Sequence, residues 1–168
     1  MFQVNDIITY GLHGVCTISE ITKKELDGKR IEYYILKPIN DDNSTISIPV
    51  HNEKLTAKMR PTLSKDEIYS LIKELPKEEI NWIDNENLRV KQYKELLGSG
   101  NPKKILILLK SLYLHKIEQE KMNKKLHMID ERILKNAEEV LYNQFSYSLN
   151  TSQERVQDLL LKYMPASN

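Results

Sequence analysis

Residues 46–72 read ISIPVHNEKLTAKMRPTLSKDEIYSLI, and this stretch decides the fold class because the spacing of its apolar side chains changes along it. Its first five residues alternate between apolar and other side chains, as a half-buried β-strand requires. After Pro61 the apolar residues recur every three or four positions, which is the spacing of one helix face. The chain therefore predicts a β module followed by a helical module, with the boundary near residues 57–63.

The first 60 residues carry short segments that are typical of antiparallel strands. These segments are rich in β-branched residues and cover residues 7–10, 15–21, 31–36 and 45–50. Asp27-Gly28 is a two-residue hairpin signal between the second and the third. Pro49 cannot donate a ladder hydrogen bond, so it lies in a strand at a sheet edge or at the end of a strand. Since no helical pattern separates the strands, we expect a small antiparallel β-barrel.

The rest of the chain predicts helices with recognisable start and stop signals. Ser64 and Glu67 form a capping box, and Pro76 ends the helix that they begin. Asn101-Pro102 opens a long helix, with a break expected near residues 126–128. The remaining helices are expected from about Asn85 to Leu97, around residues 133–141, and after a second capping box at Thr151–Glu154. The predicted fold class is α+β, with the β-barrel in residues 1–60 and an all-α helical bundle in residues 61–168.

The composition of the 168-residue chain fits a soluble folded protein, since 40% of the residues are hydrophobic and 29% are charged. The net charge is only +1, so no strong overall field draws the protein to nucleic acid. The single cysteine, Cys16, excludes an internal disulfide framework and fits a reducing compartment. The N-terminus lacks a signal-peptide pattern, and the longest apolar run, Ile105–Leu109, is too short to cross a membrane. A cytoplasmic protein is expected.

No set of residues points to catalysis, a metal or a cofactor. Gly11–Gly14 lacks the Lys-Ser/Thr ending of a phosphate loop and is better explained as a tight turn. Cys16 lies in an alternating strand, where a packed side chain is favoured over a nucleophile. The histidines are scattered without the spacing of a zinc site: His13, His51, His115 and His127. We therefore expect that the protein is not an enzyme and needs no cofactor.

Trp82 is the only tryptophan, and it stands in a polar joint between two helical patterns. Taken alone, such a residue is more often a packing anchor than a contact for another molecule. Residues 101–135 carry nine Lys/Arg and four Asp/Glu, a net charge of +5, which alone favours a solvated helix face. Together, however, basic side chains that hold phosphates and a ring that enters the minor groove form a coherent DNA-contacting pair.

Six motifs follow one another along nearly the whole chain: FQVNDIITYGLHGV at residues 2–15, YYILK at 33–37, ISIPV at 46–50, NW at 81–82, SGNP at 99–102 and KSLY at 110–113. Each motif is weak alone. In this order, with the β module first, they resemble the CarD/CdnL family of bacterial transcription regulators. The first motif is also similar to the polymerase-binding module of transcription-repair coupling factors.

This resemblance implies a Tudor/SH3-like N-terminal domain that binds the RNA polymerase β subunit. It also implies a helical C-terminal domain that contacts promoter DNA at the upstream edge of the transcription bubble, where a family tryptophan enters the minor groove and stabilises the open complex. Trp82 matches that tryptophan. The residues expected at DNA are Trp82, Arg89, Lys91, Lys94, Lys125 and Arg132. The residues expected at the polymerase are Lys24, Lys37, Ile46, Ser47, Ile48 and Pro49.

Two positions depart from the family pattern. Ser47 stands where some members have a basic residue at the polymerase contact. Glu131 stands where some members have a basic residue that faces DNA, and Arg132 or Lys125 would take over that contact.

We therefore predict a non-enzymatic transcription regulator that reaches promoter DNA through the polymerase. Its modest net charge gives weak binding to free DNA, and tethering supplies the missing local concentration. The alternative is a protein-interaction adaptor on the polymerase, with Trp82 as a packing residue and the lysines as solubilising groups. We expect a monomer that is associated with the nucleoid through the polymerase, while a dimer swapped through residues 57–63 stays open.

Overall fold

The structure, a computed structural model, describes residues 1–78 and 81–164. The chain divides into two compact units, Met1–Thr62 and Leu63–Asn168, and the division falls within the segment where the apolar spacing of the sequence changes. Glu79 and Ile80, which belong to the polar joint around Trp82, lie outside the described residues. Each unit is described below by itself.

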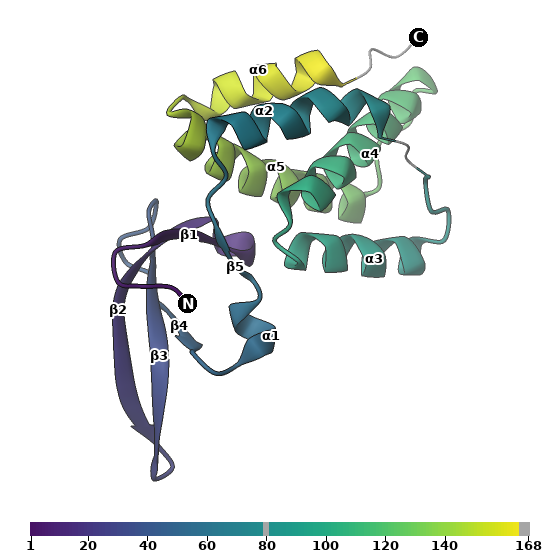
Figure 1. The fold of residues 1–168 in the computed structure, drawn as a ribbon. Helices are drawn as coiled ribbons and strands as arrows, with labels where there is room; N and C mark the ends of the chain where they lie inside the picture. Colours follow the sequence, from purple (N-terminus) through teal and green to yellow (C-terminus); the bar gives the residue numbers. More distant parts are fainter. Residues whose placement is uncertain (79–80, 165–168) are drawn as a thin grey trace. The chain divides into compact units, whose positions relative to one another are not determined.

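The first unit is built on a five-stranded antiparallel sheet (Figure 1). The strands have the order β4-β3-β2-β1-β5 and the following bounds: β1 Ile7–Tyr10, β2 Val15–Leu26, β3 Lys29–Pro38, β4 Ile46–Pro49 and β5 Met59–Pro61. The α+β class is confirmed, and so is the edge position of the strand that contains Pro49. The strand order has two ends, β4 and β5, so the pairings do not show the closed barrel that was expected.

The hairpin of β2 and β3 turns at Asp27-Gly28, as predicted. Both residues have positive φ angles, 52° and 75°, which is the conformation that a tight two-residue hairpin turn requires. The tight turn predicted at Gly11–Gly14 is present as the 3-10 turn η1 (Gly11–His13), whereas the one-turn helix α1 (Glu53–Thr56), which Asn52 caps, was not predicted. The three-residue strand β5 was also missed, because it becomes a strand only by pairing with β1.

One face of the sheet carries the core of the first unit. Its buried members come from all five strands: Ile8, Tyr10, Cys16, Ile18, Tyr34, Leu36, Ile48 and Met59. Cys16 is fully buried, and burial raises the pKa of its thiol to about 11. The thiol therefore stays protonated at neutral pH and packs as a small apolar group, as the alternating pattern predicts.

The second unit consists of five α-helices and a short 3-10 turn among its described residues. Their bounds are α2 Lys65–Glu74, η2 Leu75–Lys77, α3 Glu86–Gly98, α4 Pro102–Lys121, α5 Met128–Leu149 and α6 Gln153–Tyr163. The predicted N-caps Ser64 and Asn101 are confirmed, and Asn85 caps α3 in the same way, since each side chain accepts a backbone N–H of the first turn. The last helix is the exception: its N-cap is Ser152, one residue after the predicted Thr151.

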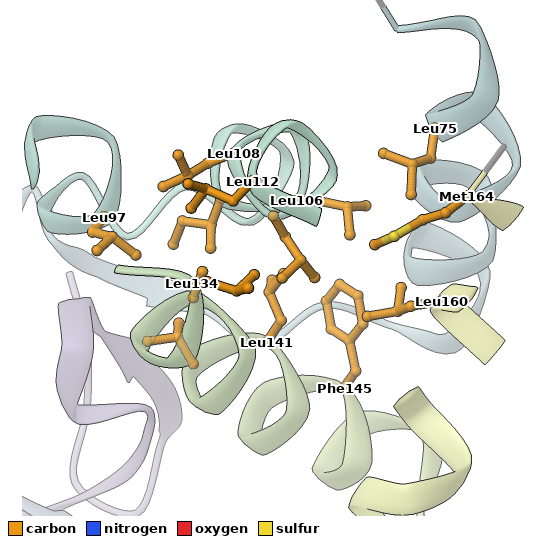
Figure 2. Packing of buried hydrophobic residues seen from close by; sticks show 14 of the residues in the cluster. Leu75, Leu97, Leu106, Leu108, Leu112, Leu134, Leu141, Phe145, Leu160 and Met164 are labelled. Atoms are coloured by element: carbon orange, nitrogen blue, oxygen red, sulfur yellow. The ribbon is translucent and has the colours of Figure 1, made fainter. Parts of the chain in front are cut away.

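The core of the second unit lies between α4 and α5, with α2, α3 and α6 packed around them. Figure 2 shows Leu106 and Leu112 of α4 directed toward Leu134 and Leu141 of α5, and Phe145 lying beside Leu160 of α6. A second packed core of this kind explains why residues 63–164 form a compact unit of their own. Among the described helices, none is long and apolar enough to span a membrane.

Candidate nucleic-acid interface and sheet edge

Trp82 lies in the segment that leads into α3, outside any helix or strand, and its side chain is half-buried against the helical core. The imidazole of His115 stacks on its indole, with ring centroids 3.5 Å apart and an interplanar angle of 7°. Tyr93 meets the indole edge to face, at 6.1 Å and 68°. The guanidinium carbon of Arg89 lies 4.6 Å from the centroid of the ring. Three side chains of α3 and α4 therefore hold the indole.

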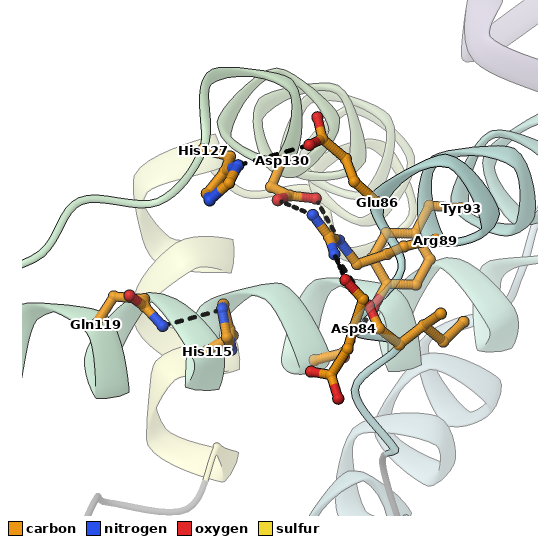
Figure 3. A network of polar contacts seen from close by, with 10 residues as sticks. Asp84, Glu86, Arg89, Tyr93, His115, Gln119, His127 and Asp130 are labelled. Carbon is orange, nitrogen blue, oxygen red and sulfur yellow. Dashed lines mark hydrogen bonds and ion pairs between the residues drawn. The ribbon is translucent and has the colours of Figure 1, made fainter.

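Arg89 occupies the buried side of α3 with only 3% of its surface exposed. Its Nε and Nη2 donate to the two carboxylate oxygens of Asp130 on α5, at 3.0 and 2.8 Å. Its Nη1 donates to the backbone carbonyls of Ile83 and Asp84, at 2.9 and 3.3 Å (Figure 3). The hydrogen bond with Asp130 raises the pKa of the guanidinium further, so the group remains charged. With its donors directed inward, Arg89 is placed to hold the Trp82 segment rather than to meet the DNA backbone as expected.

Lys110 is a second buried cation, with 3% exposure. Its Nζ donates to the carbonyl oxygens of Leu75, at 2.7 Å, and Glu78, at 3.0 Å. Burial lowers the pKa of this ammonium group. These bonds join α4 to the two ends of η2, where the carbonyl of Leu75 also accepts the backbone N–H of Glu78. The chain is thus anchored before Trp82 by Lys110 and after Trp82 by Arg89.

His115 is a further group of this site to which sequence reasoning assigned no role. It lies on α4, half-buried, and one ring nitrogen is 3.2 Å from the side-chain amide of Gln119. Burial lowers the pKa of the imidazole below its ordinary value of 6.5. At neutral pH the ring is therefore mostly uncharged, as suits a planar group stacked on an indole.

The other residues expected at DNA are exposed. Lys91 and Lys94 lie one turn apart on α3 and point away from the row of Arg89, Tyr93 and Leu97 that faces the core. Lys125 precedes α5 and Arg132 lies in its first turns, both exposed. Glu131, the departure from the family pattern, is half-buried and pairs with Lys116 at 3.2 Å.

The residues expected at the polymerase lie on β2, β3 and β4, and the pairing of these strands shows which face of the sheet each side chain occupies. Ser47 pairs with Ile35 and Lys24 with Ile31, and side chains two residues apart on β3 lie on the same face. Lys24, Lys37 and Ser47 are thus exposed on the sheet face opposite the core, and Pro49 lies on that face at the edge. Ile46 and Ile48 point to the core face, where Ile48 is 3% exposed. Lys24 also lies over the ring of Tyr33, at 5.7 Å.

Two family models match the chain. The model described as CarD-like/TRCF RID domain matches residues 2–63, and the model described as CarD, C-terminal domain matches residues 67–161, more than half of the chain. The chain belongs to the CarD family. The resemblance predicted from the six motifs is thereby confirmed, and the two matched ranges coincide with the two structural units except that the first range extends one residue into the second unit. As a CarD-family protein, the chain is a transcription-related protein that interacts with RNA polymerase, in a family of non-enzymatic transcription factors.

The structure gives physical reasons for two motifs of this CarD-family chain. In KSLY, Lys110 anchors the chain before Trp82, and the hydroxyl of Ser111 lies 3.4 Å from that of Tyr93, the ring that abuts the tryptophan. In SGNP, Asn101 caps α4 and accepts the N–H groups of Lys103 and Lys104. KSLY thus supports the segment and the ring beside Trp82, whereas SGNP begins the helix α4 that carries His115. Within residues 1–78 and 81–164, no group of three His, Cys, Asp or Glu side chains could hold a metal ion.

Proposed function

We propose that this CarD-family chain binds the RNA polymerase β subunit through β4 and the outer face of its sheet, and stabilises the open promoter complex through Trp82. In this proposal Lys91, Lys94, Lys125 and Arg132 contact phosphates near the ring, and Arg89 acts indirectly by holding the Trp82 segment. The contacts are to the groove and the backbone rather than to particular bases.

The observation that carries the proposal is the way in which Trp82 is held. The indole is only half-buried, yet the chain beside it is anchored by two buried cations. A packing anchor needs no such support, because burial alone fixes it. A ring that must enter a groove gains from being immobilised in advance, since the entropy of ordering it does not then oppose binding.

The size of the expected effect follows from what an inserted ring contributes. A full base-stacking contact is worth on the order of 1–3 kcal/mol. If all of it had to be lost before the bubble closes, the open complex would live roughly 5- to 150-fold longer. Apolar wedges in the minor groove act by partly unstacking a base step, so they realise only part of this range.

The test is the lifetime of the open complex formed by purified polymerase with wild-type protein and with Trp82→Ala. Tyr147→Ala is the matched control, because Tyr147 is an aromatic residue of the same unit that is 42% exposed and lies far from the site in sequence. We expect Trp82→Ala to shorten the lifetime and Tyr147→Ala to leave it unchanged. An unchanged lifetime with folded Trp82→Ala protein refutes the DNA contact.

The polymerase-binding half is tested by pull-down of the isolated β subunit. Lys24→Glu and Lys37→Glu reverse charges on the outer face of the sheet, while Ile48→Asp disrupts the edge strand β4. Lys65→Glu, an exposed charge reversal in the helical unit, is the control. An edge strand recruits partners by adding a strand through backbone bonds. If the β subunit is retained by all three variants, the interface lies elsewhere.

The alternative function, an adaptor on the polymerase that does not touch DNA, is favoured by one observation. Trp82 packs against the helical core and contacts three of its side chains. Under this alternative the loss of Trp82 lowers the stability of the helical unit, and crosslinking from the ring position never reaches promoter DNA. A photoreactive side chain at position 82 separates the two functions, because only the DNA-contacting function yields protein–DNA crosslinks in the open complex.

A further inference from the structure

Both faces of the Trp82 indole are covered by the protein's own side chains. The imidazole of His115 lies parallel to the ring at 3.5 Å, which is ordinary stacking contact and leaves no room for another group on that face. The guanidinium carbon of Arg89 also lies over the ring, 4.6 Å from its centroid, and therefore flanks the opposite face. With both faces covered, the indole can contact a partner only through its edge.

The His115 side of this arrangement is held in place by its surroundings. The imidazole comes from the middle of the 20-residue helix α4 and contacts the amide of Gln119 one turn later. The carboxylate of Glu118 lies 4.0 Å from its other nitrogen. Arg89 of α3, Asp130 of α5 and His127 before α5 are the charged or titratable groups that face it from other elements. The imidazole is thus a fixed backing for the ring, not a loose surface group.

We propose that His115 is a positioning residue that fixes the plane of the Trp82 indole, so that DNA meets the edge of the ring and no base stacks on its face. This inference rests on the proposed DNA contact of Trp82. It makes Trp82 a narrow wedge between base pairs or against a sugar, in keeping with the apolar side chains that enter minor grooves. His115 itself does not touch DNA.

The competing arrangement has a base taking the place of His115 on the indole. The two arrangements differ in the sign of a mutational effect. If His115 positions the ring, removing the imidazole frees the ring to tilt and shortens the open complex. If a base must displace the imidazole, removing it removes a competitor and lengthens the open complex.

The experiment compares wild-type protein with His115→Ala, His115→Phe and the control Glu120→Ala, an exposed change on the same helix. Phenylalanine keeps a planar ring that can stack, whereas alanine does not. The protein alone is measured first, and Trp82 is its only tryptophan, so the emission reports this site. An imidazole on an indole quenches it more when protonated, so the emission of wild-type protein and of Glu120→Ala falls as the pH drops below 6.5. Both His115 variants lose this pH dependence.

Open-complex lifetime on purified polymerase is measured next. We expect His115→Ala to shorten the lifetime by about 2- to 13-fold, the range that a lost aromatic pair represents, and His115→Phe to retain most of it. A pH profile that survives in His115→Phe shows that the imidazole does not lie on the ring and overturns the inference. If Trp82→Ala shortens the lifetime but folded His115→Ala leaves it unchanged or lengthens it, the inference is overturned and the proposed function stands. If Trp82→Ala has no effect, the proposed function and the inference both fall, whatever the emission shows.

Discussion

The buried Arg89–Asp130 pair allows a quantitative prediction, because the next residue, Glu131, forms a partly exposed ion pair with Lys116 that serves as an internal control. The side chains of Arg89 and Asp130 are 4% and 1% exposed, and the carboxylate accepts two guanidinium hydrogen bonds. Asp130→Ala leaves a guanidinium buried with two donors unsatisfied. Loss of one partner of such a buried pair costs about 3–5 kcal/mol. Glu131→Ala breaks the Lys116 pair, whose side chains are 35% and 34% exposed, and costs about 0–1 kcal/mol.

The assay is urea unfolding of the full chain followed by the emission of Trp82. Since this is the only tryptophan and lies in the second unit, its transition reports the helical unit and not the sheet. With an m value of roughly 1–3 kcal/mol/M, Asp130→Ala lowers the urea midpoint by roughly 1–5 M. Glu131→Ala lowers it by less than about 1 M.

A double variant separates stability from positioning. Arg89→Leu combined with Asp130→Leu removes both charges, so we expect it to recover most of the stability that Asp130→Ala loses. It does not restore the two bonds to the Trp82 segment, so its open complex stays short-lived. The reasoning is refuted if Asp130→Ala and Glu131→Ala have the same urea midpoint, because burial would then not decide the value of these pairs.

Three further predictions concern single side chains. Lys110→Met removes the ammonium donor from two backbone carbonyls, and the same unfolding assay should show a loss of about 1–3 kcal/mol together with a red shift of the Trp82 emission. Burial raises the folded-state pKa of Glu138 above 4.5, so the carboxyl contributes stability at low pH that is lost as the pH rises through that pKa. Glu138→Gln should therefore be more stable than wild type at pH 7 and equal to it below pH 4.5, in paired urea titrations. Lys91→Ala and Lys94→Ala should each reduce the slope of log affinity against log salt for promoter DNA in polymerase complexes by about one unit, and an unchanged slope excludes their phosphate contacts.

Local signals in the sequence predicted the helices well because the groups that begin a helix lie within its first turn. Ser64, Asn85 and Asn101 each bond to an N–H two or three residues away, so their role is legible without knowing the rest of the fold. β5 shows the opposite case. Its three residues become a strand because Thr9 pairs with Arg60, 51 positions along the chain. No local pattern carries that information.

The sequence predicted the site only in part, because some of its contacts join residues that lie far apart in the sequence. Trp82 stood out by residue type and by its polar surroundings, but the role of Arg89 depends on Asp130, 41 residues away. A signal was nevertheless present: Arg89, Tyr93 and Leu97 recur at the spacing of one helix face, which places the arginine on the buried side. Lys110 gave a similar signal as the only charged residue in the mostly apolar segment from 105 to 114.

Two cations are buried beside the Trp82 segment, and burying a charge costs desolvation free energy that an apolar side chain does not. Apolar residues of similar volume often stabilise as much as a buried ion pair, or more. Arg89 and Lys110 do what apolar residues cannot, since their donors fix the backbone carbonyls of Leu75, Glu78, Ile83 and Asp84 in one arrangement. The two buried cations therefore fix the conformation of the chain around Trp82 rather than increase the stability of the fold. We infer that the rigid segment serves the proposed DNA contact of Trp82, because a ring on a mobile segment would be displaced when the DNA duplex closes.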